Sequence, residues 1–282
     1  MFQGQGALLK DSDDNLIVER INPFKWLINF INKIFVIAEL EVRKLKHDPT
    51  ELITRAAQPA LWMLVFGEVF TRVRAIPTGN LSYLDFMAPG ILAQSVLFVA
   101  IFYGISIIWE RDLGIVHKFL ASPTPRTALV LGKAISAGVR AVSQAIIIYI
   151  LSLILNVNLS WQPLSMLGIL IIIIISAALF STFSLIIACI VKTRERFMGI
   201  GQVLTMPLFF ASNAIYPIAI MPEWLKAVAH VNPLTYEVDA LRTFMIRGGQ
   251  SLYGIGFDFG ALFLAMIILT TIAAKLYPSV AR

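Results

Sequence analysis

Few residues in this chain have the types and spacing that catalysis or metal binding requires. The three histidines, His47, His117 and His230, are isolated from one another, and the single cysteine, Cys189, lies within an apolar run. Metal sites need several such side chains at short, regular intervals. The sequence therefore predicts no metal site and no disulfide, and Cys189 is interpreted as a small buried apolar residue.

Gly132-Lys133 matches the end of a phosphate-binding loop, but the rest of that motif is missing. Position 127 is Thr where the motif needs Gly, and Ala134 stands where Ser or Thr would hold the magnesium ion. We therefore expect that the chain is not an enzyme and holds no cofactor. If ATP drives it, another chain must bind the ATP and magnesium.

The composition indicates an integral membrane protein. Of 282 residues, 58% are hydrophobic and only 14% are charged, and the mean hydropathy is +0.79. Ordinary soluble domains contain about 25% charged residues. The net charge of +6 follows the loops predicted to be cytoplasmic, as the positive-inside rule expects, so it does not indicate nucleic-acid binding.

A charged island at residues 110–123 separates two long apolar segments. Its apolar residues recur at helical spacing, and they are Leu113, Val116, Phe119 and Leu120. The other face carries Glu110, Arg111, Asp112 and Lys118. This pattern predicts an amphipathic loop helix over 110–121 that either docks on a cytosolic partner or lies on the lipid surface.

The chain is predicted to be an all-α integral membrane protein with six transmembrane helices. The predicted spans cover residues 52–71, 86–109, 128–155, 164–191, 197–212 and 259–276. No charged residue lies between Arg140 and Lys192, a stretch about twice as long as one span, so the chain must turn back within it. Residues 156–163 are the turn-rich place to do so, and Lys and Arg concentrate on the side that is then cytoplasmic with both termini.

Segments outside the spans have their own patterns. Residues 1–22 are predicted to be a cytoplasmic tail, and 23–47 an amphipathic helix lying in the membrane surface. Residues 48–282 form the membrane domain. Between spans five and six, helix starts at Pro222 and Pro233 predict short helices over 213–234 that dip into the outer leaflet and return.

Several polar side chains fall within the predicted spans. They are Gln58, Glu68, Gln94, Lys133 and Arg140. Polar residues at this depth either line a transport pathway or pair with one another structurally, and the sequence leaves both readings open. Gln58, Gln94 and Arg140 are the pathway candidates.

Two groups of motifs resemble a known family. The first is Glu110-Arg111-Asp112-Leu113-Gly114, then Lys118 to Pro123, then Leu131-Gly132-Lys133. The second is Ser212 to Pro217, Met221 to Leu225, Asn232 to Tyr236 and Asp239 to Arg242. Together, and in this order, they resemble ABC-2 type transporter permeases, especially the daunorubicin-resistance and nodulation-factor export branch. The resemblance covers about residues 30–276, and Asn213 stands where many relatives have Gly.

The resemblance implies a role for each segment. The coupling helix seated on a nucleotide-binding ATPase subunit would include Glu110, Arg111, Asp112, Leu113, Gly114, Val116 and Lys118. The helix at 23–47 would be a connecting helix that touches the same subunit through Glu39, Arg43 and Lys44. The outer gate would include Tyr216, Pro217, Pro222, Trp224 and Pro233. Two copies would pack around a pathway in the plasma membrane, among membrane lipids.

Three functions are therefore weighed. The first is the permease of an ATP-driven exporter for an amphipathic or lipid-like substrate such as a drug, a lipid or a lipid-linked glycan. The second is a transporter driven by an ion gradient, which usually needs acidic residues deep in the spans, where only Glu68 and Asp85 come near. The third, an intramembrane enzyme or assembly scaffold, has no residue cluster to support it.

Overall fold

The computed structural model describes residues 54, 57–73, 76–79, 81–114, 126–191 and 193–277, with the backbone alone at 126–129 and 131. The predicted tail at 1–22 and the predicted interfacial helix at 23–47 lie outside these residues. So do Val116 and Lys118 of the predicted loop helix.

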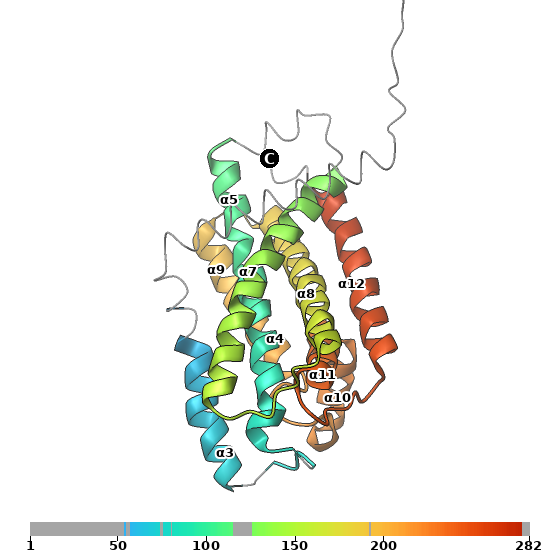
Figure 1. The fold of residues 1–282 in the computed structure, drawn as a ribbon. Helices are drawn as coiled ribbons and strands as arrows, with labels where there is room; N and C mark the ends of the chain where they lie inside the picture. Colours follow the sequence, from blue (N-terminus) through green and yellow to red (C-terminus); the bar gives the residue numbers. More distant parts are fainter. Residues whose placement is uncertain are drawn as a thin grey trace, which may run out of the picture.

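The described part of the chain is a helical bundle (Figure 1). Its long helices are α4 (Tyr83–Tyr103), continued by α5 (Ile105–Asp112), α7 (Arg126–Ile154), α8 (Pro163–Ile190) and α12 (Ile255–Leu276). They give four segments long and apolar enough to cross a membrane, with α4 and α5 counted together as one segment of 30 residues. The prediction of a helical membrane protein is confirmed, and these four segments match four of the predicted spans.

The other two predicted spans correspond to shorter helices. One is the π-helix η1 (Trp62–Gly67) followed by α3 (Glu68–Val73), and the other is α9 (Arg194–Phe210). With 17 residues, α9 is about 26 Å long, less than the roughly 30 Å of a bilayer core. The chain continues through η2 (Ile218–Ile220), α10 (Glu223–Val231) and α11 (Pro233–Met245) at one end of the bundle (Figure 1). Six spans therefore stay a prediction.

Helix α4 forms the centre of the core. It is apolar on every side, nearly all of its residues are buried, and it packs against η1, α7, α8 and α11. A helix that is hydrophobic all round is stable only when neighbours cover all of its faces. The rest of the bundle supplies that cover.

The segment that contains α4 is interrupted at Gly104. A side chain at this position would collide with Ser184 of α8 and Phe197 of α9. The Ser184 hydroxyl also donates a hydrogen bond to the carbonyl of Ile101, in the last turn of α4. The sequence predicted one helix over 86–109. The structure divides this one span into α4 and α5 at Gly104, whose backbone stays in the right-handed helical region with φ −60° and ψ −22°. The close approach of α8 and α9 leaves room only for glycine at this position.

The turn predicted at 156–163 is confirmed, and a buried carboxylate fastens it. Asn156 adopts a φ of 56°. Ser82 caps α4 by accepting a hydrogen bond of 3.1 Å from the backbone N–H of Asp85. The Asp85 carboxylate instead accepts from Asn158, at 2.8 Å from its backbone N and 2.9 Å from its Nδ2. This pairing ties the start of α4 to the turn between α7 and α8.

Gly90 brings the backbone of α4 against the segment that follows α9. An ideal Cβ on Gly90 would lie 2.4 Å from the carbonyl oxygen of Ala214 and 2.7 Å from its Cα. Both are backbone atoms, which cannot rotate out of the way. Glycine is therefore needed here for close packing between the two segments.

We expect Gly90→Ala to lower the midpoint of thermal unfolding, because its methyl group must displace the backbone at Ala214, at a free-energy cost of about 1–3 kcal/mol. Gly260→Ala is the matched control, since a Cβ within α12 would meet no atom within 4 Å. That variant should unfold at the same temperature or slightly higher, because Ala favours helix. Scanning fluorimetry of the purified proteins measures both, and equal midpoints for Gly90→Ala and wild type would contradict this packing.

Candidate functional site

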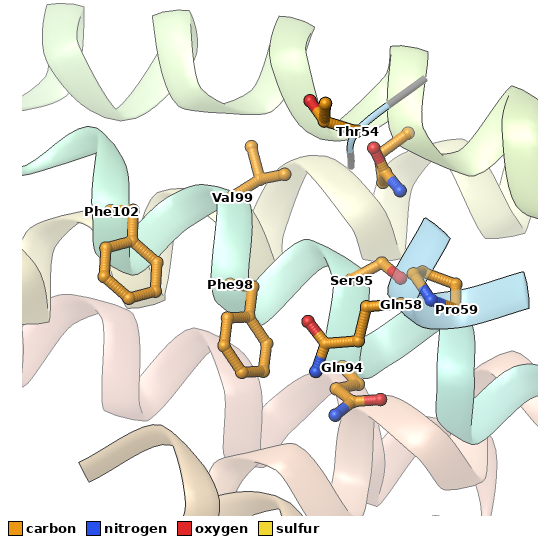
Figure 2. A pocket seen from close by; sticks show the side chains of 9 residues that line it. Thr54, Gln58, Pro59, Gln94, Ser95, Phe98, Val99 and Phe102 are labelled. Carbon is orange, nitrogen blue, oxygen red and sulfur yellow. The ribbon is translucent and has the colours of Figure 1, made fainter. Parts of the chain in front are cut away.

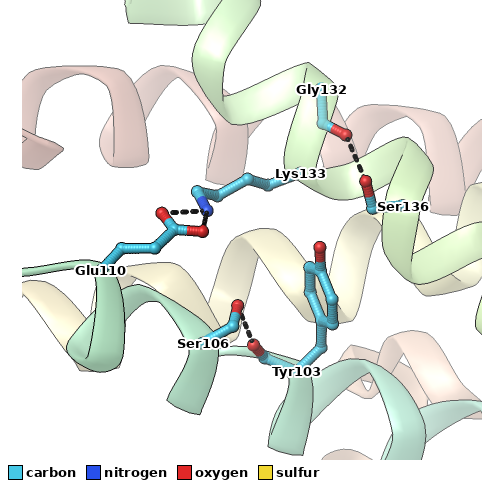
Figure 3. Close-up of polar contacts among 6 residues, drawn as sticks. All are labelled: Tyr103, Ser106, Glu110, Gly132, Lys133 and Ser136. Atoms are coloured by element: carbon cyan, nitrogen blue, oxygen red, sulfur yellow. Dashed lines mark hydrogen bonds and ion pairs between the residues drawn. The ribbon is translucent and has the colours of Figure 1, made fainter. Parts of the chain in front are cut away.

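The end of α5 projects from the bundle, where a carboxylate binds a lysine of the neighbouring helix (Figures 1 and 3). Lys133 of α7 lies 2.6 Å and 2.5 Å from the two carboxylate oxygens of Glu110. Their side chains are 15% and 26% exposed, respectively. Partial burial weakens screening by water, so this pair holds α5 to α7 more firmly than an exposed pair would.

A second ionic contact joins α5 to α9. Arg194 Nη2 lies 2.8 Å from Asp112 Oδ2, and its guanidinium Cζ sits 3.6 Å from the ring centroid of Trp109. Arg111 also contacts Asp112, at 3.3 Å. Arginine can stack on an aromatic ring while it binds a carboxylate, so Arg194 holds two residues of α5 at once.

The predicted loop helix at 110–121 begins differently in the structure. Glu110, Arg111 and Asp112 form the last turn of α5 and so continue the span. Gly114 follows with a φ of 69°, a left-handed conformation that ends helices and favours glycine. Leu113, predicted on the apolar face of the loop helix, is 68% exposed. The pattern at residues 110–123, which predicted one amphipathic helix, thus contains the end of α5.

The pathway candidates Gln58 and Gln94 line one cavity of about 320 Å³. Figure 2 shows Gln58, from the helical residues 57–61 before η1, reaching toward α4. Along α4, Gln94, Ser95, Phe98, Val99 and Phe102 follow one another. The other lining residues are Thr54, Pro59 and Gln144. The sequence reading missed Gln144. Its position one helical turn beyond Arg140 was the available signal.

Arg140, the third pathway candidate, lines an adjoining cavity of about 500 Å³. The two cavities share Val99 and Phe102. Arg140 Cζ lies 5.4 Å from the ring centroid of Tyr103, and Glu110 lines the same cavity. The face shared by Lys133 and Arg140 on α7 thus turns toward α4 and α5.

The predicted outer-gate residues lie around the short helices at the opposite end from α5 (Figure 1). Pro222 precedes α10 and Pro233 begins α11, as the sequence predicted. The Tyr216 hydroxyl donates to the carbonyl of Phe210 at 2.5 Å, and Pro217 precedes η2. Trp224 is 69% exposed. These residues do not line either of the two cavities described above.

Glu68, a further polar candidate of the first predicted span, is half exposed and lies 3.8 Å from Arg72 one turn later. This contact fits the structural alternative. The connecting-helix residues Glu39, Arg43 and Lys44 lie outside the described residues.

Sequence reasoning also missed a buried arginine beneath the short helices. Arg242 of α11 is 5% exposed. Its Nη2 donates to the carbonyls of Asn213 at 2.7 Å and Phe86 at 3.3 Å, and its Cζ lies 3.9 Å over the Phe86 ring. Arg242 therefore fastens α11 to α4 and to the segment after α9. In the sequence, Arg242 stood out only as the last residue of one family motif.

Acidic residues lie on the same helix as this arginine and in the first turn of α12. Asp239 Oδ2 accepts hydrogen bonds from the Ser251 hydroxyl at 2.8 Å and from the backbone N of Leu252 at 2.7 Å. Ser251 Oγ also lies 2.9 Å from Asp258 Oδ2. Glu237 of α11 is fully buried, and burial raises the pKa of its carboxyl well above the usual value.

The model of the ABC-2 type transporter family matches residues 32–246. The chain belongs to this family. The ABC-2 chain is 26% identical over 282 residues to the putative transport permease ycf38 of Cyanophora paradoxa, covering 95% of this chain and 97% of that one. It is 25% identical over 211 residues to the daunorubicin resistance ABC transporter permease protein DrrB1 of Streptomyces coeruleorubidus, covering 75% and 74%.

A third relative is the inner membrane transport permease YadH of Escherichia coli K12. It is 22% identical over 188 residues, which cover 64% of this chain and 70% of YadH. The family resemblance predicted from the two groups of motifs is confirmed. The ABC-2 chain is thus an integral membrane permease of the transport class.

We expect Arg242→Ala to destabilise the permease strongly, because two buried carbonyls lose their donor and the Phe86 ring loses its cation. Each unsatisfied buried group costs about 1–3 kcal/mol. Arg247→Ala is the control, since Arg247 is exposed and its backbone N–H, which the substitution keeps, donates to the carbonyl of Asn158. Thermal unfolding monitored by size-exclusion chromatography compares the two. A midpoint for Arg242→Ala equal to that of Arg247→Ala would contradict the fastening role.

Proposed function

We propose that this ABC-2 chain is the permease subunit of an exporter whose ATP is hydrolysed, with magnesium, by a separate nucleotide-binding subunit. The observation that carries the proposal is the pair of ionic contacts at the end of α5. Residues Glu110 and Asp112 hold two different helices there, through Lys133 and Arg194. A partner that moves this end of the chain thereby pulls on α7 and α9 together.

The coupling surface begins at this end and continues through residues 110–121. Exposed Leu113 offers an apolar side chain beside the charged last turn of α5, a mixture suited to a protein partner. A span of 30 residues is about 45 Å long, more than the roughly 30 Å bilayer core, which supports a projecting end in water. The helix at 23–47, with Glu39, Arg43 and Lys44, would add a second contact.

The remaining architecture follows the family. We infer six spans, namely the four long segments, the helix formed by η1 and α3, and α9. Both termini would lie in the cytoplasm. Two copies would enclose a pathway in the plasma membrane. The segments at 213–234 would form an outer gate of short re-entrant helices, and their position opposite α5 in Figure 1 supports this.

The substrate proposed is an amphipathic or lipid-like molecule. A drug, a lipid or a lipid-linked glycan would fit, and one relative named above is a daunorubicin resistance permease. The cavities beside α4, which join apolar and polar side chains, support a substrate of mixed character.

An ion-gradient transporter is the second candidate, and the buried acids Glu237, Asp239 and Asp258 favour it. They gather near the short helices at one end, where Asp239 binds backbone N–H groups. Reconstituting the chain alone in vesicles distinguishes the two functions. Transport driven by a proton gradient without any ATPase would support this candidate against the first.

The coupling role is tested by co-purification. Tagged wild-type chain, extracted in mild detergent, should bring down a nucleotide-binding subunit, and a Glu110→Ala/Leu113→Asp variant should lose most of it. The variant removes the contact to Lys133 and places a charge on the exposed apolar residue. Trp224→Asp, an exposed apolar-to-acidic change near the opposite end, is the control and should retain the subunit.

If the wild-type chain purifies folded and without any ATPase, the proposed function is wrong. If both variants retain the subunit, the partner binds elsewhere on the chain.

The link from α5 to α9 is tested by exchanging its charges. Asp112→Arg or Arg194→Asp alone should lower transport-coupled ATPase activity by about 3- to 10-fold, because like charges then face each other across the contact. The double exchange should recover part of the activity by restoring the ion pair. Recovery is incomplete because Trp109 loses its cation. Additive losses in the double variant would show that the pair carries no coupling.

A further inference from the structure

The cavity between α4, α7 and the helical residues 57–61, which precede η1, has an unusual polar lining. Three carboxamides reach it from three different helices, those of Gln58, Gln94 and Gln144. Hydroxyl side chains at Thr54 and Ser95 complete the polar part. None of the nine lining residues carries a charge.

The unpaired side-chain donor of Gln94 indicates that this cavity binds a ligand. Gln94 is only 3% exposed and lines the cavity. Its Nε2 has no hydrogen-bond partner among the described residues. A buried donor left without a partner costs about 1–3 kcal/mol. A hydrocarbon tail cannot supply the missing acceptor, whereas a carbonyl or hydroxyl oxygen can.

A charged group would not be stable at these carboxamides. Burying an ion without a counter-charge is far more costly than burying an amide. The charges nearby belong to the adjoining cavity, and Glu110 there is already bound to Lys133. The cavity at Gln94 therefore favours an uncharged polar group over an anion or a cation.

An aromatic wall continues from the carboxamides. The rings of Phe98 and Phe102 are stacked one helical turn apart, with centroids 5.9 Å apart and planes at 20°. Ser95 lies between these rings and Gln94. Its hydroxyl already donates to the carbonyl of Ile91 at 2.8 Å, so it can offer only an acceptor to a ligand. Flat aromatic faces bind hydrocarbon and the apolar faces of sugar rings.

We propose that this cavity binds an uncharged amphiphile, such as a neutral glycoside. Its oxygen atoms would lie at the carboxamides of Gln58, Gln94 and Gln144, and its apolar part along Phe98 and Phe102. The inference rests on the proposed export function, of which it names the substrate class. The carboxamide cavity would then select the substrate, and the charged residues of the adjoining cavity would have a structural role.

Three probes with the same tail and different head groups test the inference. They are octyl β-glucoside, octyl phosphate and octylammonium, each with a photoreactive diazirine in the octyl chain, applied to the permease in lipid nanodiscs. The glucoside should label residues 94–102 of α4 in a saturable way. The phosphate and the ammonium probes should label them at least about tenfold less, a difference of about 1.4 kcal/mol.

Two substitutions at Gln94 sharpen the test. Gln94→Leu keeps the size of the side chain but removes the carboxamide, so glucoside labelling should fall about tenfold. Gln94→Glu adds a charge and should shift the preference toward octylammonium. Gln162→Leu makes the same change at an exposed glutamine outside the cavity, and should label as wild type. Gln144→Leu serves as the second cavity variant if Gln94→Leu does not fold.

The inference is overturned if wild type shows no saturable glucoside labelling, if the three probes label α4 equally, or if folded carboxamide variants label normally. Labelling needs no ATPase, so it is independent of coupling. Intact labelling in the Glu110→Ala/Leu113→Asp variant, together with a wild type that binds no ATPase, would refute the export function and leave the binding site. Normal co-purification without labelling would do the reverse.

Discussion

The packing around α4 is the constraint on which the rest of the structure depends. This helix is apolar on every side and almost wholly buried, so neighbours must surround it. Two glycines show how tightly they do so, since Gly90 admits the backbone of Ala214 and Gly104 admits Ser184 and Phe197. The two ionic contacts, both cavities and the Arg242 contact described above all involve this helix or its continuation, α5.

Polar groups change character along this axis. At the α5 end they are ion pairs that remain partly exposed. Beside the middle of α4 they are carboxamides without charge. Near the short helices they are buried acids and Arg242, held by backbone N–H and carbonyl groups. This order follows the three roles proposed above, which are contact with a cytosolic partner at α5, recognition of a neutral ligand beside α4 and an outer gate at the short helices.

Local signals predicted much of this arrangement. The turn at 156–163 and the starts of α10 and α11 depend on neighbours in the sequence, and all three were found. The misses depend on contacts between distant segments. Nothing close in sequence indicates that Asp85 binds Asn158 or that Arg242 is buried over Phe86. The need for glycine at position 104 likewise arises from packing by α8 and α9, which local periodicity does not report.

Under the proposed coupling role, α5 beyond Gly104 would act as a short lever. Its eight residues give an arm of about 12 Å, so a tilt of about 10° moves its tip by about 2 Å. That displacement is similar to the difference between an ion pair at 2.8 Å and a separated one. Under the proposed coupling role, the contacts at the tip would either travel with α5 or break, so the motion passed to α7 and α9 would be a discrete step instead of a graded bend.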